Sequence, residues 1–146
     1  VIERAKKLTI KTHIFNREDF YKTEQVLNLI KSYNPNLIVL AGFLWLIPEN
    51  VINGYTGKII NIHPALLPKF GGKGMYGLNV HRAVIDASES ESGITIHYVN
   101  KYYDDGQVIF QKSCKLDTGE TPTSLANKIH KLEHKYFPEV INELLK

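Results

Sequence analysis

Two polar side chains follow a short apolar run in the middle of the chain, in the stretch Asn61-Ile62-His63-Pro64. On an extended backbone Asn61 and His63 project to the same side, because they are two residues apart. Pro64 restricts His63 further, since the residue before a proline is confined to extended conformations. An amide donor beside an imidazole can stabilise an oxyanion and transfer a proton. The same spacing also fits an ordinary strand end, with Asn61 bonded to backbone and His63 merely partly buried.

A carboxylate that could act on this histidine lies in residues 103–107, where Asp104 precedes an Asp-Gly pair between two expected strands. An aspartate close to His63 would raise the imidazole pKa and hold its orientation. Thr95 and His97 lie two residues apart on the preceding strand and could line the same pocket. Asp-Gly pairs are also common in hairpin turns, so a plain turn remains the alternative.

Two further patterns resemble ligand sites but lack the context that such sites need. Residues 72–77 match G-x-G-x-x-G, but residues 64–71 separate them from the preceding strand, so we expect a flexible loop rather than a dinucleotide site. His130 and His134 have the i, i+4 spacing of some zinc ligands, without the glutamate that follows the first histidine in metalloproteases. We therefore expect a solvated helix face there and no metal site.

The composition is that of one globular domain. With 43% apolar and 23% charged residues among 146, the sequence excludes a disordered chain, a collagen-like chain and a coiled coil. The apolar runs are too short to cross a membrane, and the 18 Lys and Arg residues are scattered, so neither a membrane nor a nucleic acid is an expected partner. The single cysteine, Cys114, cannot form an internal disulfide, which favours a reducing, cytoplasmic location.

Segments with strand and helix patterns alternate along the chain, which predicts an α/β domain. Asn16 and Thr121 are expected N-caps, and Asn34-Pro35 ends a helix. The run 37–41 is apolar throughout, as in a parallel strand covered on both faces. We expect a mostly parallel sheet with an antiparallel pair late in the chain. The expected strands are 8–15, 37–41, 58–62, 94–99 and 108–115, and the expected helices are 17–33, 48–55, 78–87 and 122–145.

Four stretches taken together resemble the folate-dependent formyltransferases. The specific part is Asn-x-His-Pro-x-Leu-Leu-Pro followed at a distance by Asp-x-Gly, and the resemblance covers nearly the whole chain from about Ala5 onward. It implies a Rossmann-like fold with helices on both faces of the sheet. Within the family, the resemblance is to the members that formylate glycinamide ribonucleotide in purine biosynthesis. The four stretches are Ala41–Phe43, Asn61–Pro68, Gly93–Val99 and Asp104–Ile109.

The resemblance implies that the formyl group of the co-substrate 10-formyltetrahydrofolate passes to the amine of glycinamide ribonucleotide, through a tetrahedral intermediate and without a metal. Asn61 and a protonated His63 would polarise the formyl group, with His63 as general acid. Asp104 would raise the pKa of His63. Leu67-Pro68 corresponds to a bond that is often cis in the family.

The resemblance also assigns two walls of a folate pocket and contacts to the second substrate. Departures from the family are Trp45, where many relatives carry a charged or smaller residue, and the segment Phe70–Gly77, which is longer than in many relatives and would suit a mobile lid. The implied folate contacts are Arg17, Leu44, Trp45, Leu46, Ile47, Asn61, Asn100, Tyr102 and Tyr103, and the implied substrate contacts are Gly42 and Glu133.

The family begins with a strand and a phosphate-binding loop, whereas this sequence begins at Val1 within a helix pattern. We therefore expect residues 1–146 to form a single formyltransferase catalytic domain that is N-terminally incomplete by roughly 30 residues or more. The alternatives are a 10-formyltetrahydrofolate hydrolase, against which Pro64 speaks, and the catalytic domain of a methionyl-tRNA formyltransferase, which needs a further domain to hold tRNA. A folate- or nucleotide-binding module without activity is the alternative from another class.

Overall fold

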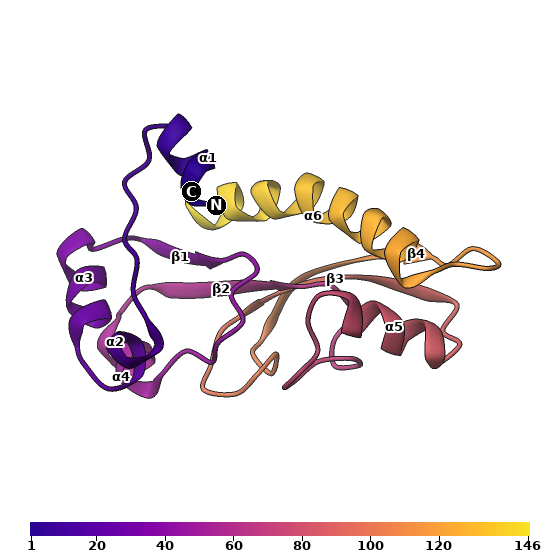
Figure 1. The fold of residues 1–146 in the computed structure, drawn as a ribbon, viewed down its shortest axis with the longest axis horizontal. Helices are drawn as coiled ribbons and strands as arrows, with labels where there is room; N and C mark the ends of the chain where they lie inside the picture. The colour runs from indigo at the N-terminus through magenta and orange to yellow at the C-terminus, as the bar shows by residue number, and fades with distance from the viewer.

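The computed structural model of the protein describes residues 1–146. Helices and strands alternate along the chain, as the sequence pattern predicts (Figure 1). The strands are β1 (Leu37–Leu40), β2 (Lys58–His63), β3 (Glu91–Tyr98) and β4 (Val108–Lys115). The helices are α1 (Ile2–Lys7), α2 (Arg17–Tyr21), α3 (Gln25–Tyr33), α4 (Glu49–Gly54), α5 (Leu78–Asp86) and α6 (Pro122–Leu144). None of these helices combines the length and apolarity needed to cross a membrane.

The strands form one mixed sheet in the order β1-β2-β3-β4. β1 and β2 are parallel, whereas β2–β3 and β3–β4 pair antiparallel. The α/β class and the late antiparallel pair are confirmed, but within this chain the parallel pairing is limited to β1 and β2. A parallel pair needs a crossover, which α4 provides, while residues 99–107 form a loop that allows only the antiparallel return. β1 lies at the sheet edge. Its Val39 side chain is exposed, so β1 is not covered on both faces as expected.

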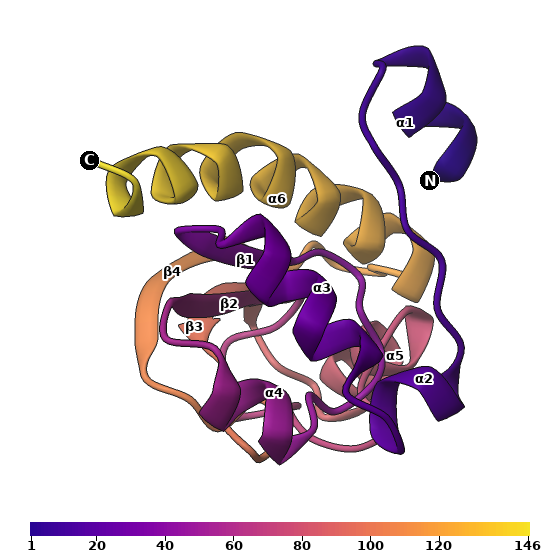
Figure 2. The same ribbon diagram turned by 90° about the vertical axis from the view of Figure 1, so that its left-hand side faces the viewer.

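The expected strand over residues 8–15 is wrong. This segment is extended but pairs with no strand, and it joins α1 to α2 outside the body of the molecule (Figure 2). Its side chains Leu8, Ile10 and Ile14 are exposed, and only Phe15 at its end packs against the core. Alternating residues form a strand only where a neighbouring strand can accept their hydrogen bonds and cover one face.

The single helix expected over residues 17–33 is two helices, α2 and α3, because Thr23 interrupts it. Its hydroxyl donates to the Asp19 carbonyl at 2.7 Å and accepts from the Gln25 N–H at 3.2 Å. Such local hydrogen bonds compete with those of a continuous helix. The ends are as predicted, since Asn16 caps α2 in a reciprocal box with Asp19. Asn34 ends α3 in a left-handed conformation, with φ 43°.

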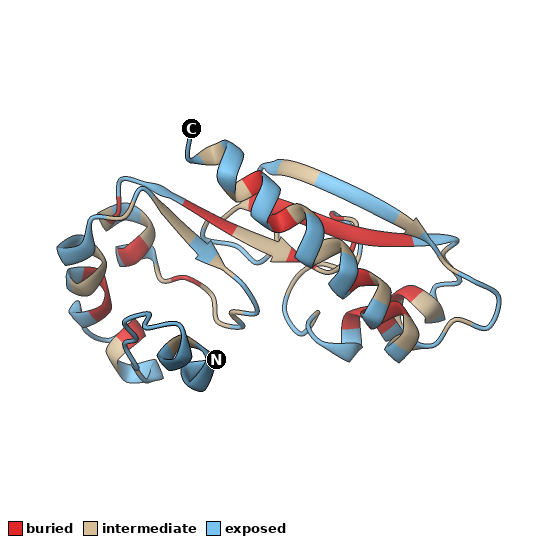
Figure 3. Cartoon of the chain, turned by 90° about the horizontal axis from the view of Figure 1, so that it is seen from above, coloured by how far each residue is buried: buried red, intermediate tan, exposed pale blue.

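Helices cover both faces of the sheet, in agreement with the expectation. On one face, α5 and α6 pack against Ile60, Ile94 and Ile96. On the other face, α2, α3 and α4 form a second core with Ile59. Figure 2 shows α6 and α4 on opposite sides of the sheet, and Figure 3 shows buried residues concentrated on the central strands and on one side of α6. β2 is therefore a central element whose carboxyl end lies between two helical layers.

Docking of α6 onto the sheet depends on Ile129, whose side chain is fully buried against Val84, Ile94 and Leu125. We expect Ile129→Ala to lower the free energy of unfolding by about 2–5 kcal/mol, because it removes buried methylene groups and leaves a cavity. Urea denaturation measures this loss. Lys131→Ala, an exposed substitution on the same helix, is the matched control. A loss in Ile129→Ala no larger than in the control would contradict this account of the core.

Candidate active site

The polar pair of β2 meets a second polar pair on β3. Asn61 is opposite His97 and His63 is opposite Thr95 in the antiparallel register. Residues opposite one another in a sheet have side chains on the same face. The four side chains therefore share the sheet face that bears Ile59, at the carboxyl end of β2. The sequence spacing predicted the two pairs, and the register shows that they are adjacent.

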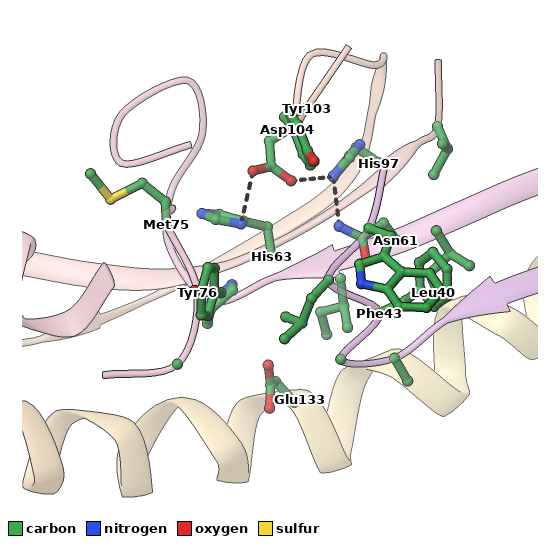
Figure 4. Close-up of a pocket in the computed structure, with 18 of the residues that line it drawn as sticks. Leu40, Phe43, Asn61, His63, Met75, Tyr76, His97, Tyr103, Asp104 and Glu133 are labelled. Atoms are coloured by element: carbon green, nitrogen blue, oxygen red, sulfur yellow. Dashed lines mark hydrogen bonds and ion pairs between the residues drawn. The ribbon is translucent and has the colours of Figure 1, made fainter. Parts of the chain in front are cut away.

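Asp104 lies between the two imidazoles (Figure 4). One carboxylate oxygen is 3.5 Å from Nδ1 of His63, and the other is 3.6 Å from Nε2 of His97. The Gly72 N–H donates to the same carboxylate at 2.9 Å. Burial alone would raise the pKa of Asp104, but His97, His63 and the Gly72 N–H lower it below its usual value. Asp104 is therefore an anion shared by two histidines.

The loop that carries Asp104 is not a simple hairpin turn. Asp104 has a left-handed backbone, with φ 52°. A Cβ at Gly106 would lie 1.6 Å from the Tyr98 carbonyl oxygen, so the backbone approaches β3 where only glycine fits. This close approach places Asp104 over the end of β3, where His97 lies.

Both ring nitrogens of His63 face polar groups of the protein. Nε2 donates to the Phe70 carbonyl at 2.8 Å, while Nδ1 faces Asp104. The side chain is almost fully buried. Burial lowers the pKa of His63, and the Asp104 charge and the Phe70 carbonyl offset this effect only in part. Asp104 thus acts with the expected sign, but the net shift of the His63 pKa is downward, which favours the neutral ring over the protonated one.

Asn61 contacts His97 rather than His63. Its Nδ2 lies 3.3 Å from Nε2 of His97, whose Nδ1 donates to the Tyr98 carbonyl at 2.8 Å. Because the Tyr98 carbonyl holds a proton on Nδ1, Nε2 can accept from the Asn61 amide. One amide proton of Asn61 is then engaged, and the second remains for a ligand.

These groups line a cavity of about 950 Å³ at the carboxyl ends of β1 and β2. Arg17 is one of the lining residues, and its guanidinium lies over the Tyr21 ring. Phe43 and Trp45 pack against the core with Ile59 and also line the cavity, while the exposed Tyr102 and Tyr103 lie on another part of the wall. The predicted residues found in the lining are Arg17, Gly42, Leu44, Trp45, Leu46, Ile47, Asn61, His63, Tyr102, Tyr103, Asp104 and Glu133.

Asn100 is the predicted contact that the structure does not bring into the cavity lining. Its amide is used within its own loop, where Oδ1 accepts from the Tyr102 N–H at 2.9 Å and Nδ2 donates to Asp105 at 3.3 Å. Such side-chain bonds to nearby backbone are the ordinary role of asparagine in a turn. Asn100 therefore shapes the loop that carries Asp104.

The glycine-rich segment 72–77 and helix α6 complete the cavity. Glu133 extends from α6 toward the site (Figure 4), and burial raises the pKa of this carboxyl while His130 and His134 oppose the shift. His130 and His134 are exposed, as predicted, yet both line the cavity. No group of three or more His, Cys, Asp or Glu side chains is placed to hold a metal ion.

Sequence reasoning missed three contributors to the site. The Phe70 carbonyl and the Gly72 N–H are backbone groups, which carry no signal in residue type. His81, on α5, also lines the cavity and is almost fully buried, and its Nδ1 has no hydrogen-bond partner. In the sequence His81 lies among apolar residues of an expected helix, and this pattern does not indicate that its side chain faces a cavity.

His81 makes stability depend on pH. Burial, with His130 and His63 nearby, lowers its pKa from 6.5 to about 4. The unfolded chain binds a proton at this residue below pH 6.5 and the folded chain does not, so acidification favours unfolding. We expect the free energy of unfolding to fall between pH 7 and pH 5 by about 1–2 kcal/mol less in His81→Gln than in the parent. Urea titrations at both pH values measure this, with the exposed His13→Gln as control. Equal falls in the two variants would contradict the assignment.

The Asp104 charge opposes the effect of burial and so limits how far the pKa of His63 falls. In Asp104→Asn the attraction that raises this pKa is lost, so we expect the pKa of His63 to fall further. The pH titration of the His63 ring resonances by NMR measures the shift. Asp105→Asn, a neighbouring exposed aspartate, is the matched control. A rise, or no change, in Asp104→Asn would show that Asp104 does not act on His63.

Comparison with known proteins identifies the family of the chain. Residues 1–141 match the Formyl transferase family. The chain is 39% identical over 126 residues to the chloroplastic phosphoribosylglycinamide formyltransferase of Arabidopsis thaliana, covering 86% of this chain and 43% of that protein. It is 37% identical over 149 residues to the phosphoribosylglycinamide formyltransferase of Bacillus subtilis, covering 99% of this chain and 74% of that protein. It thus spans less than half the length of the plant relative.

A solved structure gives the same result for the fold. The crystal structure of glycinamide ribonucleotide transformylase 1 from Geobacillus kaustophilus superposes with a TM-score of 0.87 at 35% identity. The match covers 100% of this chain and 77% of that one. Sequence and backbone therefore agree over nearly all of residues 1–146. This chain belongs to the formyl transferase family.

Proposed function

We propose that this chain carries the catalytic centre of a phosphoribosylglycinamide formyltransferase. In this proposal residues 1–146 act as one catalytic domain, and the formyl group passes from 10-formyltetrahydrofolate to the amine of glycinamide ribonucleotide. The observation that carries the proposal is the Asp104 carboxylate between His63 and His97, beside Asn61, in one large cavity. The printed names of the relatives support the choice of substrates.

The reaction forms a bond between the substrate amine and the formyl carbon and breaks the bond from that carbon to the folate nitrogen. Negative charge develops on the formyl oxygen in between. The free amide proton of Asn61 is the donor for this oxygen, because the other amide proton is engaged by His97. A donor fixed before reaction stabilises the charge without reorganising at that moment.

One proton must leave the amine and one must reach the departing nitrogen, so the transfer balances through a single carrier. Neutral His63 can hold that proton on Nδ1, where the imidazolium formed lies beside the Asp104 carboxylate. Nε2 is already protonated and bonded to the Phe70 carbonyl. His63 then acts as general acid toward the departing nitrogen, as the resemblance implied, but it begins the cycle neutral.

The cavity suits the two substrates. Leu44 to Ile47, with the neighbouring Phe43, offer apolar and aromatic surface to a flat pterin ring, and Tyr102 and Tyr103 line the same cavity. Glu133 extends from α6 into the opposite part of the cavity, where a carboxylate can accept hydrogen bonds from an amine. Arg17 is a cationic lining residue that can contact the folate. The cytoplasmic location expected from the single cysteine remains a prediction.

The assignment of His63 is tested by substitution. We expect His63→Ala to reduce formyl transfer by about 10²–10⁴-fold, because it removes the proton carrier. Formation of the formylated amine from purified protein, 10-formyltetrahydrofolate and glycinamide ribonucleotide measures this loss. His13→Ala, an exposed histidine hydrogen-bonded to Tyr33, is the matched control. Activity of folded His63→Ala within a few-fold of the control would reject His63 as the carrier.

The same assay separates the alternative functions. Formate release at the parent rate without an amine would identify a hydrolase. Formyl transfer to methionyl-tRNA, but not to glycinamide ribonucleotide, would identify the tRNA enzyme. Binding of folate without formation of any product would identify a binding module without activity.

A further inference from the structure

The backbone between His63 and Phe70 turns back on itself, so that the Phe70 carbonyl meets the His63 ring. The middle of this turn is held by a side chain from β3. The Thr95 hydroxyl donates to the Ala65 carbonyl at 2.7 Å and accepts from the Leu67 N–H at 3.0 Å. Thr95 is fully buried, so these bonds are shielded from water. Thr95 therefore fastens the turn at two points between His63 and Phe70.

A second side chain, from β4, holds the same turn. Gln111 is opposite Thr95 in the β3–β4 register. Its Nε2 donates to the Leu67 carbonyl and to the Thr95 hydroxyl, both at 2.9 Å. Both protons of the amide are thus used. Both backbone groups of Leu67 are bonded into one network, which joins the turn to two strands.

The next residue along the same face of β3 supports this fit. A Cβ at Gly93 would lie 2.7 Å from Leu66 and 2.2 Å from the Lys112 carbonyl oxygen. Glycine therefore leaves space for the Leu66 side chain at the tip of the turn. Gly93, Thr95 and His97 alternate on one strand face, and each contacts or accommodates a part of the site.

We propose that Thr95 and Gln111 are positioning residues of the formyl-transfer site, which fix the orientation of the His63 ring through the Ala65–Leu67 turn. This inference rests on the proposed function. The turn holds the Phe70 carbonyl in place, and that carbonyl holds the proton on Nε2 of His63. Nδ1 is then left facing Asp104. When the turn is released, Nε2 loses its fixed acceptor and the ring is no longer aimed at the carboxylate.

Gln111→Met tests this proposal with little risk to folding, since Gln111 lies on an exposed edge strand and methionine has a similar shape. We expect kcat to fall by about 10–100-fold, as when an outer partner of a site residue is removed. KM for both substrates should change little, because the cavity lining is unchanged. Gln25→Met, the same substitution at an exposed position far from the turn, is the matched control.

Thr95 supplies a second pair of variants. Thr95→Val removes the hydroxyl but keeps the shape, and Thr95→Ser keeps the hydroxyl. We expect Thr95→Val to lower kcat at least as strongly as Gln111→Met, and Thr95→Ser to restore most of it. If Thr95 served the fold alone, Thr95→Val and Thr95→Ser would lower the thermal stability but would have similar kcat values.

An NMR titration of the His63 ring in the parent and in Gln111→Met gives a readout that needs no turnover. The proposal expects a changed pKa and changed ring-nitrogen shifts of His63 in folded Gln111→Met, with parent values in Gln25→Met. Parent values in Gln111→Met would overturn the proposal, as would a parent kcat. If the parent transfers no formyl group, the proposed function fails, and the NMR comparison still decides whether the turn orients His63.

Discussion

The contact between the buried His63 imidazole and the Asp104 carboxylate is the interaction on which the site depends. A buried polar group without a partner costs about 1–3 kcal/mol. The Phe70 carbonyl accepts the N–H of Nε2, and Asp104 lies 3.5 Å from Nδ1, where it pairs with the ring once Nδ1 is protonated. The Gly72 N–H in turn donates to Asp104. The loop after β2 and the loop after β3 are therefore tied to each other through one histidine and one carboxylate.

This arrangement requires unusual backbone at two places. Asp104 and Phe70, which provide the two partners of His63, both have positive φ values, 52° and 57°. Such conformations cost about 1–3 kcal/mol each for residues other than glycine, and they persist where the surrounding structure enforces them. Gly106 against β3 enforces the first, and the hydrogen-bonded turn around Leu67 precedes the second. The strained positions lie where the proposed chemistry needs fixed acceptors.

Two of the three buried histidines that line the cavity, His63 and His81, differ in their electrostatic surroundings. Burial lowers the pKa of both, but only His63 has a carboxylate that opposes the shift. Burial, with His130 and His63 nearby, lowers the pKa of His81 to about 4, and its Nδ1 has no hydrogen-bond partner. His63 can therefore take up a proton with a stabilised product, whereas His81 stays neutral near pH 7. Their different environments, rather than their residue type, separate a proton carrier from a lining residue.

Local periodicity and residue type were enough to predict the alternation of helices and strands, the N-caps of α2 and α6, and the shared face of Asn61 and His63. Contacts between distant segments were needed to establish that residues 8–15 pair with no strand and that Asp104 reaches His63. These contacts also decided the net sign of the His63 pKa shift, which depends on burial by residues distant in sequence. The Phe70 carbonyl could not be predicted, since every residue has one and only the turn aims it.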